Sequence, residues 1–403
     1  MLKATFSSFK HPNYRLWFMG QLVSLIGTWM QNVAVPWLVY HMTGSPFFLG
    51  LVSFTSAVPM LTLTLWAGVI ADRIDRRRVL IATQTTMMLL AFLLAAAFYS
   101  NILQWWHILF FSAASGIAQA FDAPARQALV ADLVPRKEMM NAIALNSAMF
   151  NGARVIGPAL AGITLALTGP GWCFVINGIS FLAVIVSLFL MKTPDANRQT
   201  TKKSALSEIA DGLRYIMGHS EIRILIVLLA ITNVFAVGYS SLLPAFARDV
   251  LHSGEFGLGW LSTAVGVGAL IGALTLAALG HYNRKGLLLT VGNLLFPASV
   301  IGFAFSTSMP LSLALIAVSG FGFMVQNATV NTLIQSRVED RLRGRVMSVY
   351  TVVFQGFFPI GALFAGTVAQ HSSIALGAAL GAGIALAFGL LLLWKIPEIR
   401  RMC

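Results

Sequence analysis

Residues 68–78 read Gly68-Val69-Ile70-Ala71-Asp72-Arg73-Ile74-Asp75-Arg76-Arg77-Arg78 and join two long apolar segments, residues 47–71 and 79–99. Each segment is long enough to cross a bilayer as a helix, which takes about 20 apolar residues. A turn with four arginines cannot lie in hydrocarbon, and its charge places it on the cytoplasmic side of a membrane. The stretch therefore predicts two membrane-spanning helices joined by a short cytoplasmic turn.

The composition of the whole chain is that of a membrane protein. Hydrophobic residues make up 57% of the 403 residues and charged residues 10%, whereas a soluble domain has about 25% charged residues. The net charge of +13 does not predict binding to nucleic acid, because the basic residues occur in short bursts between apolar segments. The two cysteines, Cys173 and Cys403, form neither a disulfide framework nor a metal site, so we expect no metal and no cofactor.

Length and hydropathy predict twelve membrane spans. They begin near Leu16, Phe47, Val79, Trp105, Met139, Trp172, Glu221, Leu258, Gly286, Leu311, Gly344 and Ile374. Lysine and arginine are concentrated in alternate loops, while the opposite loops carry none except Arg248. By the positive-inside rule, both termini are cytoplasmic, which requires an even number of spans.

The chain divides into two related halves, residues 1–192 and 221–403. The linker between them, residues 193–220, is predicted to hold an amphipathic helix on the cytoplasmic face, because apolar residues recur at helical spacing after a possible N-cap at Ser204. A shift of 204 residues superposes the halves without a gap. It aligns Ser115-Gly116 with Ser319-Gly320, Phe150 with Phe354, Gly152 with Gly356, Gly157 with Gly361 and Gly162 with Gly366.

The stretch at residues 68–78 closely resembles the loop between the second and third helices of major facilitator superfamily transporters. Gly68, Asp72, Arg73, Arg76 and the following arginine match that motif, but Asp75 replaces its second glycine. The resemblance implies an all-α integral membrane fold with twelve transmembrane helices in two pseudo-symmetric six-helix bundles. A substrate cavity near the midplane would open alternately to each side. The residues alone also allow an ordinary positively charged loop.

The predicted fifth span contains a cluster of small residues around Gly152, Gly157, Pro158 and Gly162. It resembles the Gly-Pro signature of drug:proton antiporters, although small residues also serve ordinary close packing of helices. With residues 9–16, 27–31 and 121–126, it resembles the branch of bacterial efflux permeases that contains the enterobactin exporter. That branch implies outward transport of small organic molecules in exchange for protons.

Asp122 is the only acidic residue placed inside a predicted span and away from a loop. A carboxylate at membrane depth is costly and faces a partner or a watery cavity. Arg126 follows four residues later on the same helix face, and Arg154 lies within the next span. These three residues are candidates for proton coupling. A permanent structural salt bridge between the fourth and fifth helices is the alternative, and Ser112 stands where the superfamily often has a basic residue.

The resemblance also implies a cytoplasmic latch that holds the outward-open state. Asp72, Arg76 and Asp132 match an acid-base-acid relay of relatives, together with Gly68 and Arg73 of the loop motif. The start of the eleventh span near Gly344 would place a positive helix end beside Asp72.

Polar residues at helical spacing mark possible walls of the substrate cavity, although hydrogen bonds between helices explain such residues equally well. These candidates are Gln21, Thr28, Gln31, Asn32, Asn233, Tyr239, Gln326, Asn327, Asn331, Tyr350 and Gln355. No Gly-x-x-x-x-Gly-Lys string is present, so the energy source is expected to be a gradient rather than a nucleotide.

The sequence thus predicts a secondary active transporter in a bacterial inner membrane, and not an enzyme. Proton-coupled efflux of a small amphipathic organic molecule, drug-like or siderophore-like, is the favoured function. A lipid or lysophospholipid translocator and an importer of the same fold stay open as alternatives. The expected partners are the substrate, protons and membrane lipids, with no nucleic acid, and a monomer is expected.

Overall fold

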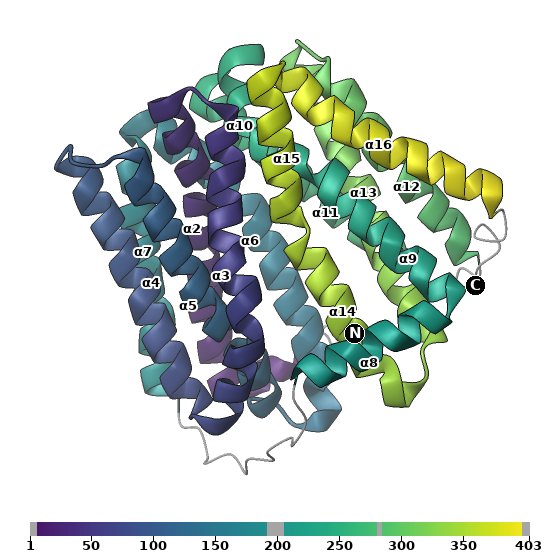
Figure 1. The fold of residues 1–403 in the computed structure, drawn as a ribbon. Helices are drawn as coiled ribbons and strands as arrows, with labels where there is room; N and C mark the ends of the chain where they lie inside the picture. The colour runs from purple at the N-terminus through teal and green to yellow at the C-terminus, as the bar shows by residue number, and fades with distance from the viewer. Residues whose placement is uncertain (1–5, 192–204, 280–283, 397–403) are drawn as a thin grey trace. The chain divides into compact units, whose positions relative to one another are not determined.

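The computed structural model describes residues 6–191, 205–279 and 284–396, and of residues 65, 68–73 and 205–208 it describes only the backbone. All regular elements in these ranges are helical (Figure 1). Contacts divide the chain into two compact units. The first comprises residues 1–42 and 55–202, and the second comprises residues 43–54 and 203–403.

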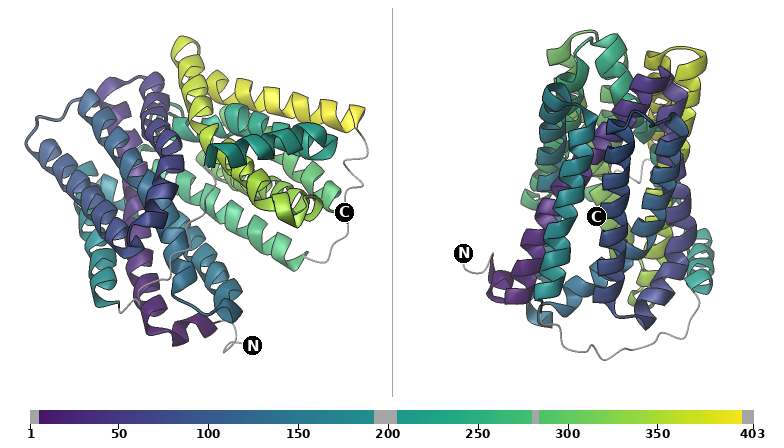
Figure 2. Two further views of the ribbon diagram at one scale, coloured as in Figure 1. Left: turned by 60° about the horizontal axis from the view of Figure 1, so that its bottom comes forward. Right: turned by 90° about the vertical axis from the view of Figure 1, so that its left-hand side faces the viewer.

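The elements from η1 to α7 supply the first unit, to which α3 contributes only its part after residue 54. They are η1 (Ser7–Lys10), α2 (Pro12–Thr43), α3 (Pro46–Arg73), α4 (Arg76–Tyr99), α5 (Trp105–Asp132), η2 (Arg136–Glu138), α6 (Met139–Thr168) and α7 (Pro170–Leu190). The long helices of this unit run roughly side by side, with α4 in contact with both α5 and α7 (Figure 2).

The second unit contains one short helix followed by six longer segments, of which the first and fifth are irregular. Its elements are α8 (Ala205–Gly218), α9 (Ser220–Ile231), η3 (Thr232–Ala236), η4 (Val237–Leu242), α10 (Leu243–Ala245), η5 (Phe246–Val250), α11 (Gly254–Ala278), α12 (Lys285–Ala304), α13 (Met309–Arg337), α14 (Asp340–Gly356), α15 (Phe358–His371) and α16 (Ile374–Lys395). The predicted seventh span is therefore not a uniform helix, since η3 and η5 are π-helical and η4 is a 3-10 helix. The predicted eleventh span is divided into α14 and α15.

Eleven helical segments of the described residues are long and apolar enough to cross a membrane. The helix α5 is not among them, although its 28 residues are more than enough for a crossing. It carries the charged residues Asp122, Arg126 and Asp132. With α5 as the twelfth, the segments correspond to the twelve predicted spans, and the chain is a multi-pass membrane protein.

Local sequence explains where several helices begin and end. Asp75 caps α4, since its Oδ1 accepts a hydrogen bond of 3.0 Å from the backbone N–H of Arg78. Asp75, which stands where the resembling loop motif has a glycine, therefore serves as the N-cap of α4. Gly169 adopts a φ of 84° between α6 and α7, and Pro170 occupies the first turn of α7.

The internal repeat is visible in how the helices pack within each unit. A Cβ on Gly116 would lie 2.0 Å from the carbonyl oxygen of Ser56, and a Cβ on Gly320 would lie 2.2 Å from that of Val265. The glycine shared by the halves thus lets the fourth helix of each unit approach the second helix, α3 on α5 and α11 on α13. Gly116 and Gly320, which the 204-residue shift aligns, therefore serve the same purpose, since each lies against a backbone carbonyl of the neighbouring helix.

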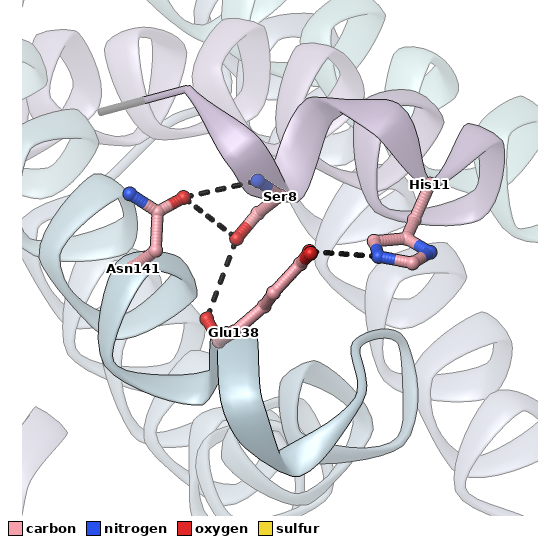
Figure 3. Close-up of polar contacts among 4 residues, drawn as sticks. All are labelled: Ser8, His11, Glu138 and Asn141. Atoms are coloured by element: carbon pink, nitrogen blue, oxygen red, sulfur yellow. Dashed lines mark hydrogen bonds and ion pairs between the residues drawn. The ribbon is translucent and has the colours of Figure 1, made fainter. Parts of the chain in front are cut away.

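The segment before the first span is tied to the start of α6 (Figure 3). The side-chain Oδ1 of Asn141 accepts hydrogen bonds from Ser8, 3.0 Å from the backbone N–H and 2.8 Å from the hydroxyl. His11 Nε2 lies 2.8 Å from Glu138 Oε2, and Ser8 is fully buried. We define the N-terminal clasp as Ser8, His11, Glu138 and Asn141.

The second unit has a counterpart of this clasp. Asp211 on α8 forms an ion pair of 3.0 Å with Arg345 near the start of α14, and Gly212 lies against the Arg345 backbone. The shift of 204 residues relates Ser8 to Gly212 and Asn141 to Arg345. The repeat therefore extends beyond the membrane spans to the segment that precedes each unit's first span.

The helix α8 buries one side against the second unit. Ile216 is 3% exposed and Ile209 packs in the same cluster, whereas Leu213 and Met217 are exposed. Gly212 allows α8 to approach α14 closely, so the buried stripe follows residues 209, 212 and 216. The predicted N-cap at Ser204 and linker residues 193–204 lie outside the described residues.

Candidate functional site

The carboxylate of Asp122 is held by side chains from two helices of the first unit. Asp122 lies in α5 and is 3% exposed. Its Oδ1 accepts hydrogen bonds from Gln84 Nε2 at 2.7 Å and from Thr83 Oγ1 at 3.1 Å, both on α4. Arg126 Nε lies 3.2 Å from the other oxygen, Oδ2. We call Thr83, Gln84, Asp122 and Arg126 the carboxylate cluster.

The structure distinguishes between the two arginines predicted near Asp122. Arg126, one helical turn along α5, forms the ion pair, and its side chain is 29% exposed. Arg154 instead lies over the indole ring of Trp29, with its guanidinium carbon 5.9 Å from the ring centroid. Of the three candidates for proton coupling, Asp122 and Arg126 therefore lie in the carboxylate cluster, and Arg154 lies against Trp29.

Sequence reasoning missed Thr83 and Gln84. Both lie in the first half of α4, in the polar run Thr83-Gln84-Thr85-Thr86, at 7% and 2% exposure. Polar side chains that are neighbours in an apolar span were a signal that could have identified them. Their partner could not be read from spacing, because it lies on another helix.

The small residues of α6 determine where Trp29 and Arg154 lie. A Cβ on Gly157 would lie 2.4 Å from the Cβ of Trp29, so only glycine allows α2 and α6 to meet there. Phe150 packs edge-on against the Trp29 ring at a centroid distance of 5.8 Å. Pro158 and Gly162 are buried in α6, whereas Gly152 has open space where a Cβ would be. Gly157 is thus the residue of the motif that this contact requires.

Two members of the predicted latch meet at the ends of α4 and α5. Arg76 forms an ion pair with Asp132 through Nη1, which also lies 3.4 Å from the carbonyl oxygen of Ala128. The backbone of α3 continues to Arg73, but the side chains of the motif residues Gly68, Asp72 and Arg73 lie outside the described residues. The part of the relay that involves Asp72, including its predicted neighbour near Gly344, stays a prediction.

The predicted cavity residues of the second unit make several buried contacts. Gln326 Nε2 donates hydrogen bonds to Thr232 Oγ1 at 2.8 Å and to Asn293 Oδ1 at 3.2 Å. Tyr239 and Ser319 share a hydrogen bond of 2.9 Å between their hydroxyls. Further pairs are Tyr350 with Asn327 Oδ1 at 3.4 Å, Gln335 with Asn331 Oδ1 at 2.7 Å, and Asn233 with the Leu229 carbonyl oxygen at 2.9 Å. These contacts show hydrogen bonding between and along helices, and a role in substrate binding stays a prediction.

The remaining cavity candidates differ in exposure. Gln31 accepts a hydrogen bond of 2.7 Å from Asn177 on α7, and Gln21 is 2% exposed. Thr28 is partly buried, while Asn32 and Gln355 are exposed. The predicted polar face of the first span is therefore divided among buried, paired and exposed positions.

The chain matches a known protein family over nearly its whole length. Residues 3–402 match the family described as "Transmembrane secretion effector" (MFS_3). The chain belongs to this family. It is thus a transporter of the major facilitator superfamily, and the resemblance found in the sequence motifs is confirmed.

Several characterised relatives align with most of the chain. The enterobactin exporter EntS of Shigella boydii is 28% identical, over 97% of this chain and 93% of its own. The staphyloferrin A transporter of Staphylococcus aureus is 26% identical over 87% of either chain. The multidrug efflux pump Tap of Mycolicibacterium fortuitum is 27% identical, over 86% of this chain and 87% of its own.

Solved structures confirm the fold class. A POT family transporter in complex with 5-aminolevulinic acid superposes with a TM-score of 0.76 at 12% identity, over 96% of either chain. A bacterial homolog of the human lysosomal transporter Spinster, in an inward-facing and unoccupied conformation, gives a TM-score of 0.71 at 15% identity. It covers 96% of this chain and 95% of its own. At these identities the likeness concerns the fold alone.

Proposed function

We propose that this protein exports a small amphipathic organic molecule from the bacterial cytoplasm in exchange for protons. Two kinds of observation support the proposal. The family is described as a transmembrane secretion effector, and two of the named relatives are a multidrug efflux pump and an exporter. The carboxylate cluster provides, within a membrane span, an acidic group that can gain and lose a proton. The proposal of proton coupling rests on one observation, the buried carboxylate of Asp122 within a membrane span.

The relatives named for siderophores and drugs support a small organic molecule as the substrate, and we propose that it has polar and apolar parts. We propose an inner-membrane location with both termini cytoplasmic, since lysine and arginine are concentrated in the loops on that side. The protein then acts with its substrate, protons and membrane lipids, and as a monomer.

Reconstitution into liposomes tests this function. Purified protein is inserted into vesicles with an imposed pH gradient, and transport of siderophores, cationic dyes and lysophospholipids is compared, with a pH-sensitive dye inside the vesicles. Proton-coupled efflux predicts that one of the siderophores or dyes moves with a stoichiometric proton flux in the opposite direction. Transport of lysophospholipid alone would support the lipid translocator instead, and transport indifferent to the pH gradient would refute proton coupling.

A further inference from the structure

The side-chain amide of Gln84 contacts Asp122 through its nitrogen, while its oxygen has no hydrogen-bond partner among the described residues. Its Nε2 donates to Asp122 Oδ1 at 2.7 Å. Its Oε1 is buried and accepts no hydrogen bond from any described residue. Gln21 and Gln326 have a buried Oε1 in the same condition, so the case of Gln84 rests on its partner, an acid that can exist in two protonation states.

The two protonation states of a carboxyl group require different hydrogen-bond partners. An ionised carboxylate only accepts hydrogen bonds, so it requires the amide N–H of Gln84. A protonated carboxyl group gains an O–H donor and requires an acceptor nearby. A half-turn of the Gln84 amide would present Oε1 in place of Nε2. The oxygen with no donor in the present arrangement is therefore the acceptor that the protonated acid needs.

Thr83, the other donor to Asp122 Oδ1, has a second acceptor within reach. Thr83 Oγ1 lies 3.1 Å from Asp122 Oδ1 and also 3.1 Å from the carbonyl oxygen of Leu80. Its single hydroxyl hydrogen can turn from one acceptor to the other. The contacts of Asp122 Oδ1 thus suit a group that alternates between two protonation states.

The internal repeat shows the neutral version of the same arrangement in the second unit. A shift of 204 residues places Gln326 at the position of Asp122 and Val330 at that of Arg126. Gln326 is paired with Asn293, which lies on α12, the third long segment of its unit, as Gln84 lies on α4. There the amide oxygen Oδ1 of Asn293 accepts the hydrogen bond from a permanently uncharged partner. This is the orientation expected of Gln84 toward a protonated Asp122.

Among the described residues, the charged group in contact with Asp122 is that of Arg126. Its own helix supplies Arg126. The helices packed against α5 include α3, α4 and α6. The charged residues of α4 are Arg76, Arg77 and Arg78 in its first turn, where Arg76 pairs with Asp132, and Arg154 of α6 lies over Trp29. The charged residues of α3, Asp72 and Arg73, lie outside the described side chains. In the described part of the chain, Gln84 and Thr83 are the neutral groups that donate a hydrogen bond to this carboxylate. Of the two, only the amide donates and accepts through different atoms.

We propose that Gln84 is a positioning residue that serves both protonation states of Asp122, through its amide nitrogen for the carboxylate and its amide oxygen for the acid. This inference rests on the proposed proton exchange at Asp122. Loss of the Gln84 amide removes a donor from the charged form, so the acid should bind its proton at higher pH. The expected shift is about one pH unit, the size that accompanies loss of one hydrogen bond to a charged group.

Infrared titration of the reconstituted protein tests the proposal without relying on transport. The carboxylic-acid C=O band that appears on acidification is compared in wild type, Asp122→Asn and Gln84→Met, which keeps the length of the side chain. The matched control is Gln326→Met, the same change at the repeat position that has no acid. The band should be absent in Asp122→Asn, should appear at a pH about one unit higher in Gln84→Met, and should be unmoved in Gln326→Met.

The outcomes separate this inference from the proposed function. A band that disappears in Asp122→Asn but titrates normally in Gln84→Met leaves Asp122 as the proton carrier and refutes the role of Gln84. A band unaffected by Asp122→Asn removes the basis of both. If Gln84→Met does not fold, Gln84→Leu provides the second variant, and an equal shift in Gln326→Met would show that the effect is only structural.

Discussion

Replacing Asp122 with Asn should abolish uphill transport while leaving the transport cavity able to operate. An asparagine has the size of a protonated aspartate and cannot release a proton. Its side-chain oxygen can still accept hydrogen bonds from Thr83 and Gln84. The interaction lost is the contact of 3.2 Å between Arg126 Nε and Oδ2, together with the negative charge.

Asp122→Asn should affect both the stability of the protein and the coupling of transport to protons. Arg126 is 29% exposed, so water can replace part of its lost partner, and the free energy of unfolding should fall by about 1–3 kcal/mol rather than by the larger cost of a fully buried unpaired charge. Coupling should suffer far more. One proton that crosses 100 mV supplies about 2.3 kcal/mol, which sustains roughly a fifty-fold substrate gradient. In Asp122→Asn that gradient should collapse to equilibrium.

Two transport modes in proteoliposomes provide the assay, measured at matched protein incorporation. Uphill efflux driven by a pH gradient requires proton exchange, whereas exchange of labelled for unlabelled substrate requires only the cavity. We expect Asp122→Asn to lose the first and keep the second. Asp249→Asn is the matched control, since Asp249 is an exposed carboxylate with an arginine neighbour at 3.5 Å, and it should keep both.

Two results would contradict this reasoning in different ways. If both modes decline together with the yield of folded protein, the pair of Asp122 and Arg126 is a structural salt bridge and not a coupling device. If Asp122→Asn performs full proton-driven efflux, Asp122 carries no transported proton. Attention would then pass to Asp132, which pairs with Arg76 near the end of α5.

Three further predictions concern topology and packing. A cysteine at Asn101 should react with an impermeant thiol reagent added outside intact cells, and a cysteine at Lys202 should not; external labelling at Lys202 would overturn the proposed orientation. Gly157→Val should lower thermal stability by about 1–3 kcal/mol, because its Cβ would meet Trp29 Cβ at 2.4 Å, while Gly152→Ala, with open space at its Cβ, should be silent; equal melting temperatures would refute the close contact of α2 and α6. Asn141→Ala removes both hydrogen bonds to Ser8 and should cost about 1–3 kcal/mol, seen as faster proteolysis of the N-terminal segment; wild-type proteolysis would show that the N-terminal clasp does not hold that segment.

Much of the architecture could be predicted because a membrane restricts what a chain can do. Apolar length, the positions of arginines and turn residues such as Gly169-Pro170 are local properties, and a spanning helix must satisfy its own backbone. The ion pair of Asp122 with Arg126 was predictable for the same reason, since four residues along a helix bring two side chains together. Repeat positions were readable at glycines because Gly116 and Gly320 meet the same steric demand.

Contacts between helices could not be predicted in the same way. Thr83 and Gln84 reach Asp122 because of how α4 is rotated against α5, and no spacing within one segment encodes that rotation. The buried side of α8 depends on Gly212 against Arg345, a neighbour 133 residues away. The π-helical turns at Thr232–Ala236 and Phe246–Val250 likewise have no signature in hydropathy, although the first contains Thr232, which accepts a hydrogen bond from Gln326.

The two units also differ in a way that bears on mechanism. A duplicated fold provides two equivalent positions on the fourth and tenth spans, yet the acid stands at only one, with an amide at the other. A single buried carboxylate limits the protons that this pair of positions can exchange to one per cycle. Placing the acid in both halves, by Gln326→Glu, would add a second exchangeable proton beside Asn293 but no arginine, since Val330 stands where Arg126 does. Without that cation the new acid should stay protonated over a wider pH range than Asp122, because burial disfavours its charged form. Of these two equivalent positions, only the one in the first unit therefore carries an acid together with a cation one helical turn away.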